Sequence, residues 1–148
     1  MVSEDRGPVW AYDTFDGKFP LFTASDGENQ EILSIIGQPC TPDVRLELES
    51  LGVTCVVGVF PATFFTSAPR EVSFVHVDID TYIATQAALE LFHPRMIYSG
   101  VFLVHDYDNW GLPGVKRAVD GFVASPWGRE YDCGMSDGHF RLRRRWPK

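Results

Sequence analysis

The sequence predicts a mixed α/β fold with a mostly parallel sheet, and three observations support this prediction. Apolar runs typical of buried strands alternate with stretches whose apolar residues recur at helical spacing. Acidic side chains directly follow several of these runs, where parallel strands would end. Near the end of the chain, two strand-like segments flank a turn that contains glycine, which favours a closing antiparallel pair.

The first half of the chain predicts two strands and two helices. In order, they are a strand at 8–12, a short helix at 31–36, a helix from Thr41 to Gly52 and a strand at 53–59. Thr41 is a favourable N-cap, and Gly52 is a favourable residue at which to stop a helix. The rest of residues 22–40 gives no clear pattern.

The second half predicts strands and helices in regular alternation. The expected elements are a strand at 72–77, a helix at 84–92, a strand at 100–104, a helix at 113–122 and strands at 131–133 and 139–143. Because parallel neighbours need right-handed crossovers, we expect helices on both faces of the sheet. Ligands of such sheets bind at the carboxyl ends of the strands.

Composition places the chain among globular proteins. It has 148 residues, of which 45% are hydrophobic, so we expect a single domain over residues 1–148. A formal net charge of −7 disfavours nucleic acid as a partner. The sequence has neither a signal-peptide pattern nor an apolar run that could span a membrane, which predicts a cytoplasmic protein without a membrane partner. A homo-oligomer stays open.

Two further groups of side chains receive structural interpretations. The three cysteines are odd in number and lack CxxC spacing, which predicts reduced, mostly buried thiols at Cys40, Cys55 and Cys133. A basic cluster near the C-terminus is interpreted as the solvated side of a last strand; it comprises Arg141, Arg143, Arg144 and Arg145.

The first candidate for chemistry is the pair Asp78 and Asp80, which follows the strand at 72–77. Two carboxylates at this spacing could share a hard cation such as Mg²⁺, which prefers oxygen ligands. The alternative is that Asp80 caps the helix that begins near Thr81. We therefore expect Asp78 to face a site, with Asp80 open between cap and ligand.

The second candidate is the pair His105 and Asp106, at the end of the strand at 100–104. If the two strands are neighbours, Asp78, His105 and Asp106 form a mixed oxygen and nitrogen metal site. An imidazole ligand admits manganese, iron or zinc more readily than carboxylates alone do. His105 is thus a candidate ligand or general base.

Other polar residues carry weaker signals. Asp13 ends the first strand and could bind ribose hydroxyls, although a turn former is the simpler interpretation. His76 lies within a strand and is expected to be packed. His93 precedes a proline at a helix end, where a capping role fits, and His139 has only a weak signal for the rim of a pocket.

Several segments together resemble the macrocin O-methyltransferase (TylF-type) family. They are residues 9–17 (VWAYDTFDG), 57–63 (VGVFPAT), 77–82 (VDIDTY), Thr85, 88–90 (ALE), 94–95 (PR), Gly100, 106–107 (DY) and 114–122 (GVKRAVDGF). They occur in the family's order and span nearly the whole chain. The resemblance implies a Rossmann-like class I methyltransferase fold and an enzyme that uses S-adenosylmethionine and Mg²⁺, or another divalent metal, to methylate sugar hydroxyls of natural products.

The resemblance also implies roles for particular residues. Asp13 matches the acid that contacts the cofactor's ribose, and Asp78 matches a metal ligand. Asp106 matches the second aspartate of the family's paired ligands, whereas His105 stands where the first is expected. This departure bears on which metal the site would prefer.

A second departure concerns the centre of the sheet. Family members carry a strand and a Gly-rich loop before the position of Trp10, and that strand would lie between the strands that end at Asp13 and Asp78. Without it, two rows of backbone groups lack partners. Either the flanking strands pair directly, another chain fills the gap, or the domain is partial.

These observations leave three hypotheses for function. The first is transfer of a methyl group to a hydroxyl of a small molecule, with Asp78 and His105 as catalytic residues. The second is an inactive methyltransferase-like module for binding or assembly. The third is a metal-dependent glycosyltransferase, which would use the Asp78 and Asp80 pair on a nucleotide sugar but leaves Asp106 unexplained.

Overall fold

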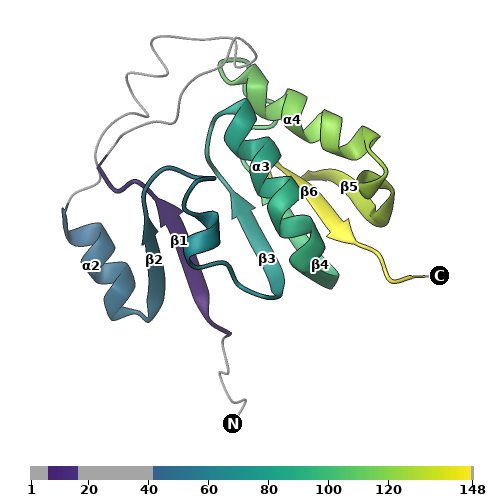
Figure 1. Cartoon of the computed structure of the whole chain (residues 1–148). Helices are drawn as coiled ribbons and strands as arrows, with labels where there is room; N and C mark the ends of the chain where they lie inside the picture. The colour runs from purple at the N-terminus through teal and green to yellow at the C-terminus, as the bar shows by residue number, and fades with distance from the viewer. Residues whose placement is uncertain (1–6, 17–41, 148) are drawn as a thin grey trace. The chain divides into compact units, whose positions relative to one another are not determined.

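The computed structural model describes residues 7–16 and 42–147, and the chain divides into two compact units (Figure 1). Among the described residues, the first unit holds 7–16 and 42–68, and the second holds 69–147. The expected helix at 31–36, the N-cap Thr41 and the thiol of Cys40 lie outside the described residues.

The first unit is built on two parallel strands. Strand β1 (Val9–Asp13) pairs with β2 (Val53–Val57) along its whole length, and helix α2 (Pro42–Ser50) precedes β2. Gly52 follows α2 with a φ of +84°, a left-handed conformation that favours glycine after a helix. Both predicted strands and the predicted helix are therefore present.

Aromatic rings pack the segment that follows β2 against β1. The ring of Tyr12 lies 5.7 Å from that of Phe60 and 6.3 Å from that of Phe64, which belongs to the short helix η1 (Phe64–Thr66). The Tyr12 hydroxyl donates to the carbonyl oxygen of Ser67 at 2.7 Å. Phe60 and Phe64 are buried, so this cluster serves as the core of the unit.

The second unit contains a four-stranded sheet in the order β3-β4-β6-β5. Its strands are β3 (Val72–Val77), β4 (Met96–Val104), β5 (Tyr131–Ser136) and β6 (His139–Arg144). Strands β3 and β4 are parallel, whereas β6 is antiparallel to both of its neighbours. The predicted mixed α/β fold with a C-terminal antiparallel pair is confirmed.

Helices α3 (Tyr82–Phe92) and α4 (Pro113–Ala124) lie side by side over one face of this sheet (Figure 1). Alternate residues in the second half of β4 are buried beneath them. The buried apolar residues include Val77, Ala88, Leu89, Phe102, Val104, Val115, Val119, Phe122 and Leu142.

Among residues 69–147, no helix covers the other face of this sheet, so the expectation of helices on both faces is not met within these residues. Helix α3 connects β3 to β4, and α4 connects β4 to β5. Both connections therefore progress in the same direction across the sheet. Right-handed connections in one direction place their helices on one face. On the uncovered face, Phe74 is 57% exposed and His76 is exposed.

The described strands pair within two sheets, with no pairing between them. Among the described residues, β1 pairs with β2 alone and β3 pairs with β4 alone. Of the arrangements considered for the centre of the sheet, direct pairing of β1 with β3 is therefore not seen. The edges of β1 and β3 that carry no partner in the described chain are rows of backbone donors and acceptors.

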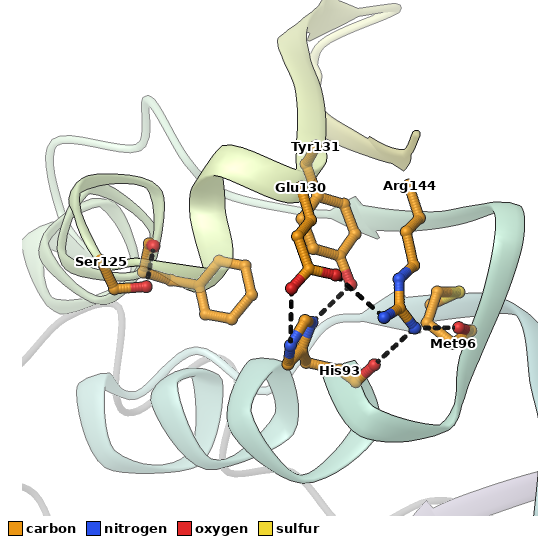
Figure 2. Close-up of polar contacts among 7 residues, drawn as sticks. His93, Met96, Ser125, Glu130, Tyr131 and Arg144 are labelled. Carbon is orange, nitrogen blue, oxygen red and sulfur yellow. Dashed lines mark hydrogen bonds and ion pairs between the residues drawn. The ribbon is translucent and has the colours of Figure 1, made fainter. Parts of the chain in front are cut away.

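Arg144 belongs to the predicted basic cluster, but it is not a solvated residue. Its side chain is 17% exposed, and its guanidinium donates to the carbonyl oxygens of His93 and Met96 and to Glu130 Oε2 at 2.9 Å. Figure 2 shows these contacts beside the hydrogen bond between His93 Nδ1 and the Tyr131 hydroxyl, which are 2.9 Å apart. Arg144 thus ties the last strand to the end of α3.

The expectation of mostly buried thiols needs correction. Cys133 is exposed and Cys55 is half-buried, so the described thiols are free but not mostly buried. Trp110, in the loop between β4 and α4, is 82% exposed. No helix in the described part of the chain has the length and apolar character needed to cross a bilayer.

Candidate metal centre at the carboxyl ends of β3 and β4

The candidate site lies where two parallel strands of the second unit end side by side. Val77, the last residue of β3, is opposite Val104, the last residue of β4. The backbone N–H of His105 continues the pairing by donating to the carbonyl oxygen of Val77 at 2.9 Å. Asp78 and His105 therefore leave the ends of neighbouring strands together, as the strand-end argument predicted.

Asp78, His105 and Asp106 converge. His105 Nδ1 lies 3.3 Å from Asp78 Oδ1 and 2.6 Å from Asp106 Oδ2. One ligand atom from each residue lies within 4.8 Å of the others, which is close enough for the three side chains to hold one metal ion. Two carboxylates and an imidazole form a donor set that fits a divalent cation.

Asn109 fixes the second oxygen of the Asp106 carboxylate. The side-chain NH₂ group of Asn109 donates to Asp106 Oδ1 at 2.9 Å, and its side-chain oxygen Oδ1 accepts from the backbone N–H of Gly111 at 3.0 Å. Such outer contacts orient a ligand and are part of the design of metal sites. They also attach the loop that carries Trp110 to the centre.

Asp80 belongs to the same acidic group. Its burial, followed by the negative charges of Asp78 and Asp106, raises the pKa of Asp80 to about 6, and a hydrogen bond with the Asp106 carboxyl adds to the shift. A carboxyl group held among other carboxylates is costly to ionise unless a cation joins them. The chemistry of the donor set therefore fits a bound cation.

The alternative role proposed for Asp80, capping of α3, is not observed. The N-cap is Thr81, whose side-chain oxygen accepts from the backbone N–H of Ala84 at 3.4 Å. Thr81 can take this role because its extended backbone starts the helix one residue later than the acidic pair. Asp80 is left free to join the acidic group.

The backbone at the centre is unusual. Asp80 has a φ of +57° and Asp106 a φ of +55°, both in the left-handed region. Non-glycine residues there cost free energy, and such residues concentrate at functional sites. These conformations turn two carboxylates into the same small space from different strands.

His105 is electrostatically tuned by this environment. The hydrogen bond from its ring to Asp106 raises the pKa of His105 above the usual value for histidine, and the charges of Asp78 and Asp106 act in the same direction against the effect of burial. With its side chain 43% exposed, the ring is open to solvent and to a substrate. His105 can therefore exchange a proton or hold a metal.

Asp13 belongs to the first unit. It is exposed at the end of β1, and its Oδ1 accepts from the backbone N–H of Phe15 at 2.6 Å. This is the turn-forming role that was the simpler interpretation of Asp13. Its second carboxylate oxygen makes no hydrogen bond to another described residue and can still serve as an acceptor.

Sequence reasoning missed His76 beside the centre and gave His139 only a weak signal for the rim of a pocket. His76 was expected to be packed, but it is exposed, and its ring lies 6.4 Å from that of His105. The His139 ring lies 5.0 Å from the His105 ring. A signal existed for His76, since residues two apart on a strand share a face and Asp78 follows at that spacing. The approach of His139 depends on strand pairing.

Solved structures resemble this chain, although neither family models nor curated protein sequences match it. The O-methyltransferase NovP is similar with a TM-score of 0.76 at 22% sequence identity, over 97% of this chain and 62% of NovP. CalS11, a calicheamicin methyltransferase, is similar with a TM-score of 0.62 at 18% identity, over 92% of this chain and 60% of CalS11.

A third structure is the apo form of CalS11, described as a TDP-rhamnose 3'-O-methyltransferase, with a TM-score of 0.55 at 19% identity over 92% of this chain. This chain has the methyltransferase fold. It spans 58–62% of the length of these three structures. At such identities the likeness establishes the fold, and chemistry must be argued from the side chains.

Proposed function

We propose that this chain is a metal-assisted, S-adenosylmethionine-dependent O-methyltransferase that acts on a hydroxyl group of a small molecule, such as a sugar of a natural product. The observation that carries the proposal is the convergence of Asp78, His105 and Asp106 on a methyltransferase fold. The strand-end position is where ligands of such sheets bind.

Asp78 and Asp106 are the proposed metal ligands, and His105 is the third ligand or the general base. A divalent cation, Mg²⁺ or another, would lower the pKa of a hydroxyl group that binds to it. Asp78 is exposed, so a substrate oxygen can approach its side of the centre. The protein's main task is to align the reactants, and proximity can lower the barrier by about 7–11 kcal/mol.

Asp13 is the proposed contact to the cofactor's ribose. A carboxylate at the end of a strand accepts hydrogen bonds from vicinal hydroxyls, as in other nucleotide-binding α/β folds. Its unengaged carboxylate oxygen in the described chain supports this role. Asp13→Asn would weaken binding of S-adenosylhomocysteine, whereas loss of a turn alone would leave that affinity unchanged.

Trp110 is a proposed surface for the sugar. Its side chain is 82% exposed, and its loop is attached to Asp106 through Asn109. An exposed indole presents a large apolar face with a polar edge, which suits stacking on a sugar ring. A sugar substrate also agrees with the described activity of CalS11 on TDP-rhamnose.

The same proposal extends to family and location. Segments such as 77–82 and 114–122 favour the macrocin O-methyltransferase (TylF-type) family over other methyltransferases. Free thiols at Cys55 and Cys133 are consistent with a cytoplasmic protein.

Two measurements test the proposal. Isothermal titration of the full chain with S-adenosylhomocysteine, and with a nucleoside diphosphate for comparison, should show binding of the first. Transfer of a labelled methyl group to a panel of sugar acceptors should fall at least about 100-fold in Asp78→Ala and Asp106→Ala. Asp108→Asn is the matched control, because Asp108 is an exposed carboxylate outside the centre.

Each outcome has a clear meaning. Methyl transfer that survives intact in both alanine variants would overturn the metal-assisted mechanism. Failure of the wild-type chain to bind S-adenosylhomocysteine would favour a module for binding or assembly. Binding of the nucleoside diphosphate alone would favour a glycosyltransferase, a reaction that none of the similar structures above is described as catalysing.

A further inference from the structure

Three histidines from three neighbouring strands gather beside the acidic centre. His76 comes from β3, His105 follows β4, and His139 begins β6. His76 lies opposite Leu103 in the register of β3 with β4, two residues before His105, so both side chains belong to the sheet face that α3 and α4 leave uncovered. The pairing of β4 with β6 brings His139 next to His105.

The three rings lie close enough together that rotation of their side chains can bring one nitrogen of each to a shared metal ion. Their centroids lie 5.0 Å (His105 to His139), 5.8 Å (His76 to His139) and 6.4 Å (His76 to His105) apart. With Zn–N bonds of about 2.0–2.1 Å and tetrahedral angles, the centroids of rings that share one zinc ion lie about 5 Å apart. Two separations come close to this value, and the third involves His76, which is exposed and can turn.

Two of the rings are already held as metal-binding histidines are. His105 Nδ1 is bonded to Asp106 Oδ2 at 2.6 Å, and His139 Nδ1 is 3.0 Å from the carbonyl oxygen of Asp137, to which it can donate. Ligating histidines commonly donate one ring N–H to a carboxylate or carbonyl, which fixes the other nitrogen as the ligand. Within the described chain, no hydrogen bond engages Nε2 of either ring.

The surrounding charge also suits a cation. Arg141 is exposed on the same sheet face, opposite Leu103. It is outnumbered by the carboxylates of Asp78, Asp80 and Asp106, which contact or surround His105. The carboxylates therefore favour a cation at His105, and histidine nitrogen prefers borderline metals such as Zn²⁺, Co²⁺, Ni²⁺ and Cu²⁺ over Mg²⁺.

We infer that His76, His105 and His139 form a second metal site, which takes a borderline divalent cation through Nε2 of His105 and His139 and one nitrogen of His76. In this site Asp106 orients His105 rather than binding the metal. The site uses the uncovered sheet face and does not depend on methyl transfer or on S-adenosylmethionine.

The test uses Co²⁺ as a spectroscopic substitute for Zn²⁺ on the metal-free full chain. We expect one equivalent of Co²⁺ to give the intense visible bands of four-coordinate nitrogen-bound cobalt, which Zn²⁺ then displaces. His76→Ala and His139→Asn should each weaken Zn²⁺ binding at least about 10-fold, since removal of even an outer partner of a ligand costs 10–100-fold. Mn²⁺ binding at Asp78 and Asp106 should change little.

Asp137→Asn is the matched control, because the Asp137 backbone carbonyl, and not its side chain, accepts from His139. Asparagine also tolerates the φ of +49° at this position. A second measurement needs no variant: Zn²⁺ should protect His76 and His139 from diethyl pyrocarbonate, as mapped by mass spectrometry. Weak six-coordinate bands, or Zn²⁺ affinity that is the same in both histidine variants and in wild type, would overturn the inference.

Discussion

Replacement of Arg144 by methionine should destabilise the second unit strongly, although the residue stands in a run of arginines. Methionine keeps the apolar stem of the side chain and removes the guanidinium. The carbonyl oxygen of Met96 then loses this donor, and that of His93 keeps the backbone N–H of Met96. Glu130 loses its ion pair with Arg144. Arg144 also lies over the Tyr98 ring, with 5.4 Å between its guanidinium carbon and the ring centroid.

The magnitude follows from burial. The Met96 carbonyl left without this donor costs about 1–3 kcal/mol, whereas the His93 carbonyl loses one of two hydrogen bonds, which costs about 0.5–1.5 kcal/mol. The contact with Glu130 adds less, because the Glu130 side chain is 44% exposed and exposed ion pairs contribute about 0–1 kcal/mol. Together these contacts predict a loss of about 2–5 kcal/mol in the free energy of unfolding for Arg144→Met.

Urea denaturation followed by tryptophan fluorescence measures this loss. The matched control is Arg143→Met, because Arg143 precedes Arg144 on β6 and is exposed. We expect the control to change the free energy of unfolding by less than about 0.5 kcal/mol. A loss below about 1 kcal/mol in Arg144→Met, or equal losses in both variants, would refute the reasoning.

Three further predictions concern single positions. Burial lowers the pKa of His93 below 6.5, so the unfolded chain binds a proton at this residue more readily than the folded chain does. The free energy of unfolding of the wild type should therefore fall as the pH drops below about 6.5, and it should fall less in His93→Gln. Denaturation at several pH values measures this difference. Gly128→Ala should lower the free energy of unfolding by about 1–3 kcal/mol, because a Cβ there would lie 2.2 Å from the carbonyl oxygen of Val123. Gly134→Ala is the control and should change it little, because the space around its Cβ is open. Equal effects of the two variants on thermal unfolding would contradict this prediction. The pKa of Asp80 is raised to about 6, so its carboxyl group ionises less readily in the folded chain than in the unfolded chain. Ionisation of Asp80 therefore lowers the free energy of unfolding as the pH rises from about 4 through 6. Without metal at pH 8, Asp80→Asn should therefore raise the melting temperature, and an unchanged or lower value would count against the repulsion described here.

The sequence was sufficient to predict the features that depend on local pattern. Apolar runs predicted the strands of both units, and the acids that follow two of these strands predicted that Asp78 lies beside His105. This succeeded because strands that run in parallel end at the same edge of a sheet, so position along the chain becomes position in space.

Features that depend on strand pairing could not be predicted in this way. Arg144 and Arg143 are neighbours in a basic run, yet one is nearly buried and the other exposed, because β6 is an inner strand that alternates between the two sheet faces. His139 reaches His105 only through the antiparallel register of β6 with β4. Neither outcome leaves a trace in composition or spacing, so both required the structure.

The two proposed metal sites share His105, and each would use a different nitrogen of its ring. Nδ1 faces the carboxylates of Asp78 and Asp106, while the inferred histidine site would use Nε2. A hard cation at the carboxylates competes with the ring proton for Nδ1, whereas a borderline metal at Nε2 is helped by the hydrogen bond from Nδ1 to Asp106. Occupation of one site should therefore alter the affinity of the other, and by linkage the effect must be equal in both directions. A titration of Mn²⁺ in the presence and absence of Zn²⁺ measures that coupling directly, and its loss in His105→Asn would assign it to this one ring.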